Sequence, residues 1–304
     1  MNIIIMGCQQ ICCDFIRYLS KKNKVNIPLV LSYDLPEDKF YNYESVIKVC
    51  KQKGIKVITP KFFSNDIIEI IKKLKPDIIF SVYYRKIIPS SIISIPSKGI
   101  INIHPSLLPF YRGPVPTAWS ILYNEKYTGI TIHKIDKGID TGDILIQKKI
   151  NINNDETGFE LYTKCMSLGS KLLIKNFNKI INNKIKPNKQ KGIGSYYGKL
   201  KKINFIDWKM KRINIKSQVR TFAKPYNPMQ AVIGNYTIII NKVILYNPRN
   251  FTAIHPGKIV EIVKNKYPVV SCADGCLMLV DFEIIPKISQ KNKKILIKKG
   301  IYFD

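Results

Sequence analysis

Residues 99–143 read GIINIHPSLLPFYRGPVPTAWSILYNEKYTGITIHKIDKGIDTGD, and nowhere else in the chain do His, Asn, Asp, Arg, Gly and Pro crowd so tightly between apolar runs. The apolar, β-branched run at 99–103 predicts a buried strand. Asn102 and His104 are two residues apart, so they project from the same face of that strand. The prolines between 105 and 116 exclude a regular helix or central strand there and predict a rigid loop. Sites of α/β enzymes lie at strand ends, so we expect the chemistry here.

Apolar runs alternate with helical patterns on the N-terminal side of this stretch, and a second strand is predicted after it at 128–133, with a turn at 136–142. Strands are predicted at 2–6, 25–32, 55–58 and 77–82, and helices at 7–19, 43–52 and 64–74, the last with Ser64 as N-cap. This alternation predicts an α/β fold with a doubly wound, mostly parallel sheet. Neither a G-x-G-x-x-G nor a G-x-x-x-x-G-K-S/T motif is present, so no dinucleotide fingerprint or P-loop is predicted.

The sequence pattern of the C-terminal half predicts where the first domain ends and predicts a complete second domain. A long helix at 156–181, with Asp155 as its N-cap, closes a first domain at 1–182. Residues 183–202 are polar, Lys-rich and interrupted by Gly, which predicts a linker. The second domain, 203–304, starts with a helical pattern at 213–222, for which Asp207 is the candidate N-cap.

Five short β runs follow that helix, at 230–233, 236–245, 257–264, 269–272 and 277–284. Gly, Pro, Asn and Asp-Gly turns separate them, which predicts a smaller β-rich, open-barrel-like C-terminal domain. The Lys-rich tail at 287–299 is expected to be solvated.

Composition narrows the class of protein. A length of 304 residues suits two domains, and the net charge of +29 is spread over every segment, which indicates general polyanion affinity rather than one nucleic-acid site. Seven cysteines without a C-x-x-C pair and only three His predict neither a disulfide framework nor a metal site. No run reaches the ~18 apolar residues of a membrane span, and no basic segment precedes the first strand, so we expect a cytoplasmic protein without a membrane partner.

The opening stretch resembles the signature of the folate-dependent formyltransferases, the family of the methionyl-tRNA, glycinamide-ribonucleotide and nucleotide-amino-sugar formyltransferases. The resemblance is carried by Asn102, His104, SLLP at 106–109, YRG at 111–113, Pro116 and IDTGD at 139–143. It implies a Rossmann-like formyltransferase domain. It also implies that the family's catalytic Asn, His and Asp correspond to Asn102, His104 and Asp140.

Formyl transfer from a folate nitrogen to an amine needs these residue types. His104 can accept and return the proton, Asn102 offers an uncharged N–H donor to the developing oxyanion, and Asp140 can orient His104 and favour its charged form. The alternative is structural: His104 would have its hydrogen-bond partners within its loop, and Asp140 would only cap a turn.

The resemblance also implies binding residues. The co-substrate 10-formyltetrahydrofolate is expected at Lys86, Ile87, Ile88, Asp136, Lys137, Gly138 and Ile139, mostly through backbone groups. The acceptor is expected at Tyr84, Arg85, Ser106, Tyr111 and Arg112. The alternative to acceptor binding is that Tyr84 packs against other aromatic rings and that the Arg85 guanidinium is solvated. Arg112 would either pair with acceptor phosphates or lock its loop by hydrogen bonds to carbonyls.

The acceptor itself is the most open question. The charge favours a methionyl-tRNA formyltransferase. MGCQQ at 6–10, however, departs from the Gly-Thr-Pro turn usual in that branch, and YYR at 83–85 and KPY at 224–226 resemble the sugar branch. We weight these local features more and expect N-formylation of a UDP- or dTDP-linked amino-deoxysugar for a surface glycan. The alternatives are the tRNA enzyme, the one case in which a nucleic acid is the expected partner, and a non-catalytic nucleic-acid-binding protein. Homodimer formation is left open.

Overall fold

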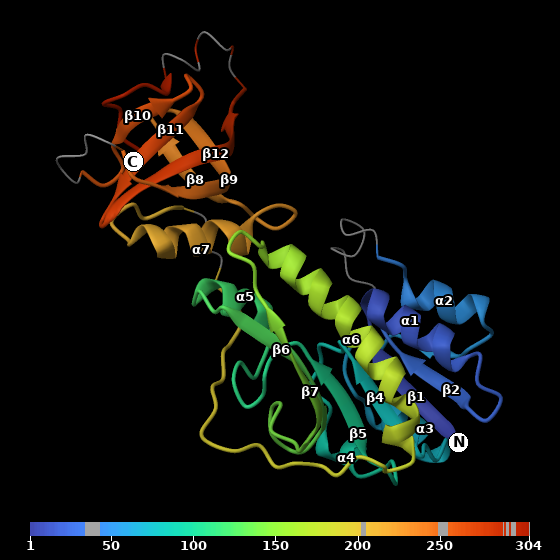
Figure 1. The fold of residues 1–304 in the computed structure, drawn as a ribbon. Coiled ribbons are helices and arrows are strands. Elements are labelled where there is room, and N and C mark those ends of the chain that lie inside the picture. The colour runs from blue at the N-terminus through green and yellow to red at the C-terminus, as the bar shows by residue number, and fades with distance from the viewer. Residues whose placement is uncertain are drawn as a thin grey trace. The chain divides into compact units, whose positions relative to one another are not determined.

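The structure, a computed structural model, describes residues 1–33, 43–201, 205–248, 255–287, 289, 292 and 296–303 (Figure 1). It divides into two compact units. Unit 1 comprises Met1–Pro116, Tyr127–Asn151 and Tyr162–Lys199, and unit 2 comprises Thr117–Lys126, Ile152–Leu161 and Leu200–Asp304. Two short segments from the first half of the chain therefore pack with the C-terminal half, and the predicted linker belongs to unit 1 as far as Lys199.

Unit 1 is built on a seven-stranded sheet in the order β3-β2-β1-β4-β5-β6-β7. Its strands are β1 (Asn2–Gly7), β2 (Asn26–Leu31), β3 (Val57–Ile58), β4 (Ile78–Val82), β5 (Ile100–His104), β6 (Tyr127–Lys134) and β7 (Ile144–Asn151). The first five run parallel, and β6 and β7 are antiparallel to their neighbours. This confirms the predicted doubly wound, mostly parallel sheet. All five parallel strands end at one edge, so His104 and the residues after β1 and β4 share that edge.

Helices cover both faces of this sheet. They are α1 (Gln9–Leu19), α2 (Val46–Gln52), α3 (Asn65–Lys73), α4 (Ser90–Ile93) and the long α6 (Gly158–Ile181). Phe80 of β4 meets Phe15 of α1 and Phe177 of α6 with ring centroids 5.0 and 6.0 Å away, so α1 and α6 lie side by side on one face (Figure 1). Ile79, the preceding residue, packs on the other face with Ile71 of α3 and Ile92 of α4. The period-2 alternation of a strand explains this division.

The N-terminus of α6 differs from the sequence prediction. The helix begins at Gly158 rather than Glu156, because Thr157 and Glu160 form a capping box: Glu160 N–H donates to Thr157 Oγ1 at 3.2 Å and Thr157 N–H donates to Glu160 Oε2 at 2.8 Å. Asp155, the predicted cap, instead pairs with Lys216 at 2.6 Å.

Three described elements of the structure were not predicted, the first of them the short helix α4. Helix α5 (Pro116–Leu122) starts at the last proline of the loop, where a proline is tolerated because the first helical N–H needs no partner within the helix. Strand β7 extends the sheet next to β6.

Unit 2 contains a five-stranded antiparallel sheet in the order β10-β11-β12-β9-β8, which confirms a separate β-rich part. Its strands are β8 (Met229–Ile233), β9 (Tyr236–Tyr246), β10 (Ile259–Val263), β11 (Tyr267–Cys272) and β12 (Gly275–Ile285). Helix α7 (Arg212–Phe222) covers the sheet with Ile215 and Val219. Its N-cap is Lys211. Asp207, the predicted cap, accepts a hydrogen bond from Lys209 N–H instead.

Polar contacts explain why two early segments belong to unit 2. The buried Arg220 guanidinium of α7 donates to the carbonyls of Asn153 and Asn154 at 3.1 and 3.0 Å, and burial lowers its pKa. Ser217 donates to the Asn124 side chain.

Of the Lys-rich tail at 287–299, predicted to be solvated, residues 288, 290, 291 and 293–295 lie outside the described residues, and the described lysines Lys287, Lys298 and Lys299 are exposed. Ile297 departs from the prediction, because it is buried in the core of unit 2.

The seven cysteines are free and buried, as expected for packed thiols. No helix within the described ranges is long and apolar enough to cross a membrane.

Replacing Phe177 by Ala tests the packing of α6 on the sheet. Phe177 is 1% exposed, so the cavity should lower the free energy of unfolding by about 3–5 kcal/mol in chemical denaturation. Phe62→Ala is the matched control, because that ring is 70% exposed and its loss should change stability by no more than about 0.5 kcal/mol. Equal effects of the two variants would contradict this account of the core.

Candidate functional site

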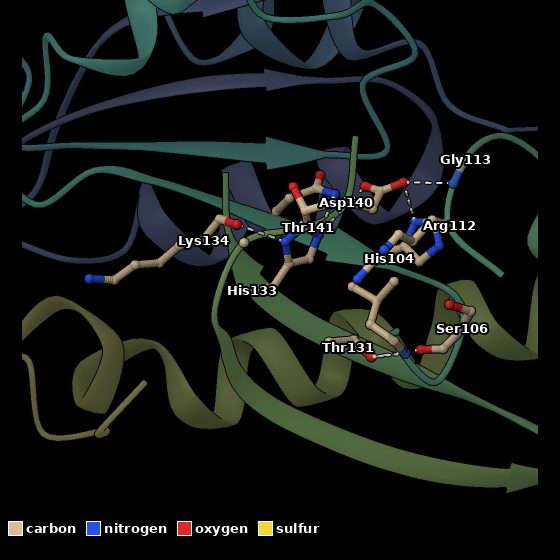
Figure 2. A network of polar contacts seen from close by, with 12 residues as sticks. His104, Ser106, Arg112, Gly113, Thr131, His133, Lys134, Asp140 and Thr141 are labelled. Atoms are coloured by element: carbon tan, nitrogen blue, oxygen red, sulfur yellow. Dashed lines mark hydrogen bonds and ion pairs between the residues drawn. The ribbon is translucent and has the colours of Figure 1, made fainter. Parts of the chain in front are cut away.

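Three side chains predicted from the sequence converge at the carboxyl end of β5. His104 is the last residue of that strand, and Asn102 precedes it on the same face. The turn after β6 brings Asp140 to His104 (Figure 2). His104 Nδ1 lies 3.6 Å from Asp140 Oδ2. The side chains of His104 and Asp140 are only 7% and 16% exposed, so their interaction is screened little by water.

The ring of His104 is oriented by its second nitrogen. Nε2 lies 2.9 Å from the carbonyl oxygen of Tyr111, which can only accept, so Nε2 carries a proton and donates it there. The Tyr111 carbonyl reaches this position from a backbone with φ +58°, in the left-handed region. Nδ1 is therefore the nitrogen that faces the Asp140 carboxylate. A protonated ring would have an acceptor at both nitrogens.

Asp140 is held from two sides. Its own backbone has φ +54°, a conformation that costs a non-glycine residue energy and that the surroundings must enforce. Its Oδ2 accepts a 2.9 Å hydrogen bond from the Gly113 amide, on the loop that follows His104 (Figure 2). The carboxylate thus joins the β5–α5 loop to the β6–β7 turn.

His133 belongs to the site although the sequence analysis did not select it. In the antiparallel pairing of β5 and β6 it lies directly opposite Asn102, and Asn102 Nδ2 is 3.1 Å from His133 Nε2. His133 Nδ1 donates to the Lys134 carbonyl at 2.7 Å, so Nε2 has a free lone pair and accepts from Asn102. Burial lowers the pKa of His133 to about 4, against the opposing charge of Asp140, which keeps the ring neutral. His133 thereby fixes the orientation of the Asn102 amide.

The expected folate residues lie on two loops near this edge. Ile87 is 79% exposed and Ile139 44% exposed, so both loops present apolar side chains to solvent, whereas Ile88 is buried in the core. Lys86 donates to the Lys61 carbonyl at 2.8 Å and is occupied there. In the second loop, Asp136 Oδ1 accepts from Gly138 N–H at 3.1 Å and from Thr141 Oγ1 at 2.6 Å. These bonds shape the turn that carries Lys137 and delivers Asp140.

Most of the expected acceptor residues have structural contacts. Tyr84 packs between Tyr33 and Phe63, and burial raises its pKa to about 12. Arg85 is exposed, and its backbone N–H donates to the Tyr33 hydroxyl at 2.8 Å.

Ser106 and Arg112 hold the loop after β5. Ser106 is fully buried and donates to the Phe110 carbonyl at 2.7 Å, so it is not accessible to an acceptor in this structure. The guanidinium of Arg112 donates from Nε and Nη2 to Gln190 Oε1 at 3.2 and 2.8 Å. Arg112 was expected either to pair with acceptor phosphates or to lock its loop, and this contact favours the second role. The acceptor of its hydrogen bonds is a side-chain amide and not a main-chain carbonyl.

Three residues that the sequence analysis did not select complete the site: Thr131, His133 and Gln190. Their roles depend on strand register and on a distant segment, which no local pattern reveals. Among the described residues, no group of three or more His, Cys, Asp or Glu side chains is arranged to hold a metal ion.

An amide, an imidazole and a carboxylate that meet at the carboxyl end of a strand are the residue types of an acid–base site in an α/β enzyme. The chain belongs to the formyltransferase family: the formyl transferase model matches residues 2–177, and the model for the formyl transferase C-terminal domain matches residues 199–298. It is a folate-dependent formyltransferase with the two-domain architecture of the methionyl-tRNA enzymes.

Three relatives illustrate the range of acceptors. The methionyl-tRNA formyltransferase of Clostridium tetani (strain Massachusetts / E88) is 31% identical, covering 100% of both chains. The sugar 3N-formyl transferase WlaRD, solved with dTDP and 5-N-formyl-THF, has a TM-score of 0.73 at 26% identity, covering 95% of this chain and 99% of that one. The N-formyltransferase of Helicobacter canadensis, solved with folinic acid and dTDP-3-aminofucose, has a TM-score of 0.73 at 27% identity, covering 92% of this chain and 99% of that one.

The neutral state of His133 predicts a pH dependence of stability. The folded-state pKa, about 4, lies below the ordinary value of ~6.5, so below that value the unfolded chain takes up a proton that the folded chain does not. Stability from this residue is fully present above pH ~6.5 and is lost as the pH falls towards 4. In urea unfolding from pH 7 to 4.5, the wild type should lose roughly 1–3 kcal/mol more than His133→Gln. Parallel curves for the two proteins would contradict a buried, neutral His133.

Proposed function

We propose that the protein transfers the formyl group of 10-formyltetrahydrofolate to the amine of a nucleotide-linked amino sugar. The observation that carries the proposal is the likeness to two sugar N-formyltransferases over more than nine-tenths of this chain and of theirs. Those proteins were solved with a formylated folate and with dTDP or a dTDP-linked amino sugar. The departure of 6–10 from the tRNA branch and the local resemblance of 83–85 and 224–226 to the sugar branch support the same acceptor class.

The proposed chemistry assigns one task to each central residue. The amine forms a bond to the formyl carbon, the carbon–nitrogen bond to folate breaks, and one proton moves from the amine to the folate nitrogen. His104 Nδ1 holds that proton between the two events, next to Asp140, which stabilises the charged ring. The second N–H of the Asn102 amide, whose first is bound to His133, donates to the formyl oxygen as negative charge develops.

We propose that the folate lies against the loops that carry Ile87 and Ile139. Exposed apolar side chains on both loops suit an aromatic pterin ring, and the intervening backbone groups suit its hydrogen-bonding edge. The acceptor then approaches His104 along the loop of residues 106–112. Arg112 acts there as a structural residue, because Gln190 already occupies its guanidinium.

A methionyl-tRNA acceptor is the second candidate. A 31% identical relative that matches this chain from end to end carries that name, and a net charge of +29 suits a polyanionic tRNA. The site geometry is common to both acceptors, since each presents a primary amine.

An acceptor panel distinguishes the two. The purified protein is assayed with 10-formyltetrahydrofolate against initiator tRNA charged with methionine and against UDP- and dTDP-linked 3-amino and 4-amino sugars. We expect at least one sugar to be formylated with a kcat/KM of ~10⁴ M⁻¹ s⁻¹ or more, the lower range for enzymes on their own substrates. Formylation of the tRNA at physiological salt, with every sugar inert, would overturn the sugar assignment.

Asp140→Asn tests the catalytic set. Asparagine has the same shape and its Oδ1 still accepts from Gly113, so the fold should persist, but the charge beside His104 is lost. Turnover should fall by ~10²–10⁴-fold with the melting temperature nearly unchanged. Asp66→Asn, an exposed helix carboxylate, is the control for a change of net charge. Wild-type turnover in Asp140→Asn would reduce Asp140 to a structural role in its turn.

A further inference from the structure

Residues 188–198, named here the strap, pack along the loop that follows His104. The strap joins this loop by backbone hydrogen bonds: Arg112 N–H donates to Ser195 O at 2.9 Å, Tyr197 N–H donates to Arg112 O at 3.0 Å, and Ser195 N–H donates to Pro109 O at 3.1 Å. The Ser195 hydroxyl also accepts from Tyr111 N–H at 2.9 Å. The strap is therefore part of the site although it begins 45 residues beyond Asp143, the end of the signature.

Two glycines permit this close contact. Gly113 has φ +93°, and a Cβ there would lie 2.4 Å from the Tyr197 carbonyl oxygen. Gly194 has φ +68°, and a Cβ there would lie 2.5 Å from the Pro109 carbonyl oxygen. No side chain larger than hydrogen fits at either position without displacing backbone.

Gln190 connects the strap to both loops that hold the Asp140 carboxylate. Its Nε2 donates to the carbonyls of Asp140 and Gly142, each at 2.8 Å, and its Oε1 accepts from the Arg112 guanidinium. The chemistry of the partners fixes the amide orientation, since carbonyls only accept and a guanidinium only donates. The amide thus makes four hydrogen bonds.

Gln190 contacts both loops that meet at the hydrogen bond between the Gly113 amide and the Asp140 carboxylate. In one loop it binds the main chain of Asp140 itself, at φ +54°. In the other it binds Arg112, the neighbour of Gly113. We propose that Gln190 is a positioning residue for Asp140, which acts on catalysis through the placement of that carboxylate. This inference rests on the catalytic role assigned to Asp140 in the proposed function.

A double-mutant cycle tests the assignment. Gln190→Ala should lower kcat by roughly tenfold to a hundredfold, the size expected from a small misplacement of a catalytic group, and change the acceptor KM less than threefold. In the Asp140→Asn background the same substitution should change kcat less than twofold, because the group it positions has been removed. Gln190→Glu keeps the acceptor for Arg112 but opposes the two carbonyls with negative charge, so it should lose activity like Gln190→Ala.

Amide hydrogen exchange gives a readout that needs no acceptor. In Gln190→Ala the Gly113 amide and the amides of residues 138–143 should exchange roughly tenfold faster than in the wild type. Lys189→Ala, an exposed neighbour in the strap, is the matched control and should leave exchange and turnover unchanged.

Unchanged exchange in Gln190→Ala, wild-type turnover in Gln190→Glu, or an equal loss of kcat in both backgrounds would overturn the role of Gln190. A failure of the acceptor panel would leave the exchange result intact, so the two proposals fail separately.

Discussion

The site depends on one hydrogen bond, from the Gly113 amide to the carboxylate of Asp140. It joins the loop after β5 to the turn after β6 and places the carboxylate 3.6 Å from the imidazole of His104. Asp140 adopts a left-handed backbone conformation that an isolated turn would avoid, so the surrounding contacts must enforce it. The strap, through Gln190, supplies two of those contacts.

Burial divides the two imidazoles of the site between different tasks. His133 is 1% exposed, and its low pKa keeps it neutral, so its lone pair can orient Asn102. His104 has a carbonyl at one nitrogen and a carboxylate at the other, an environment that accommodates a proton on both. One ring is therefore a fixed acceptor, and the contacts of the other suit the proton transfer proposed above. Residue type is the same in both cases, and only the surroundings differ.

The comparisons agree on the reaction and differ on the acceptor. This is the pattern expected if the family conserves the formyl-transfer centre while acceptor contacts lie outside it. In this chain several residues that the signature offers for the acceptor, among them Ser106 and Arg112, are occupied by contacts that hold the loop.

The sequence by itself determined the alternation of strands and helices, the five β runs of unit 2 and the three central residues Asn102, His104 and Asp140, because periodicity and local motifs encode them. It did not give β7, α4, α5, the start of α6 or the roles of His133 and Gln190. Those were decided by tertiary structure. The antiparallel register that sets His133 opposite Asn102 and the fold that returns Gln190 to Asp140 join residues 31 and 50 positions apart. Hydrogen bonds between such distant residues form only when packing brings them together, and no local pattern of residues records them.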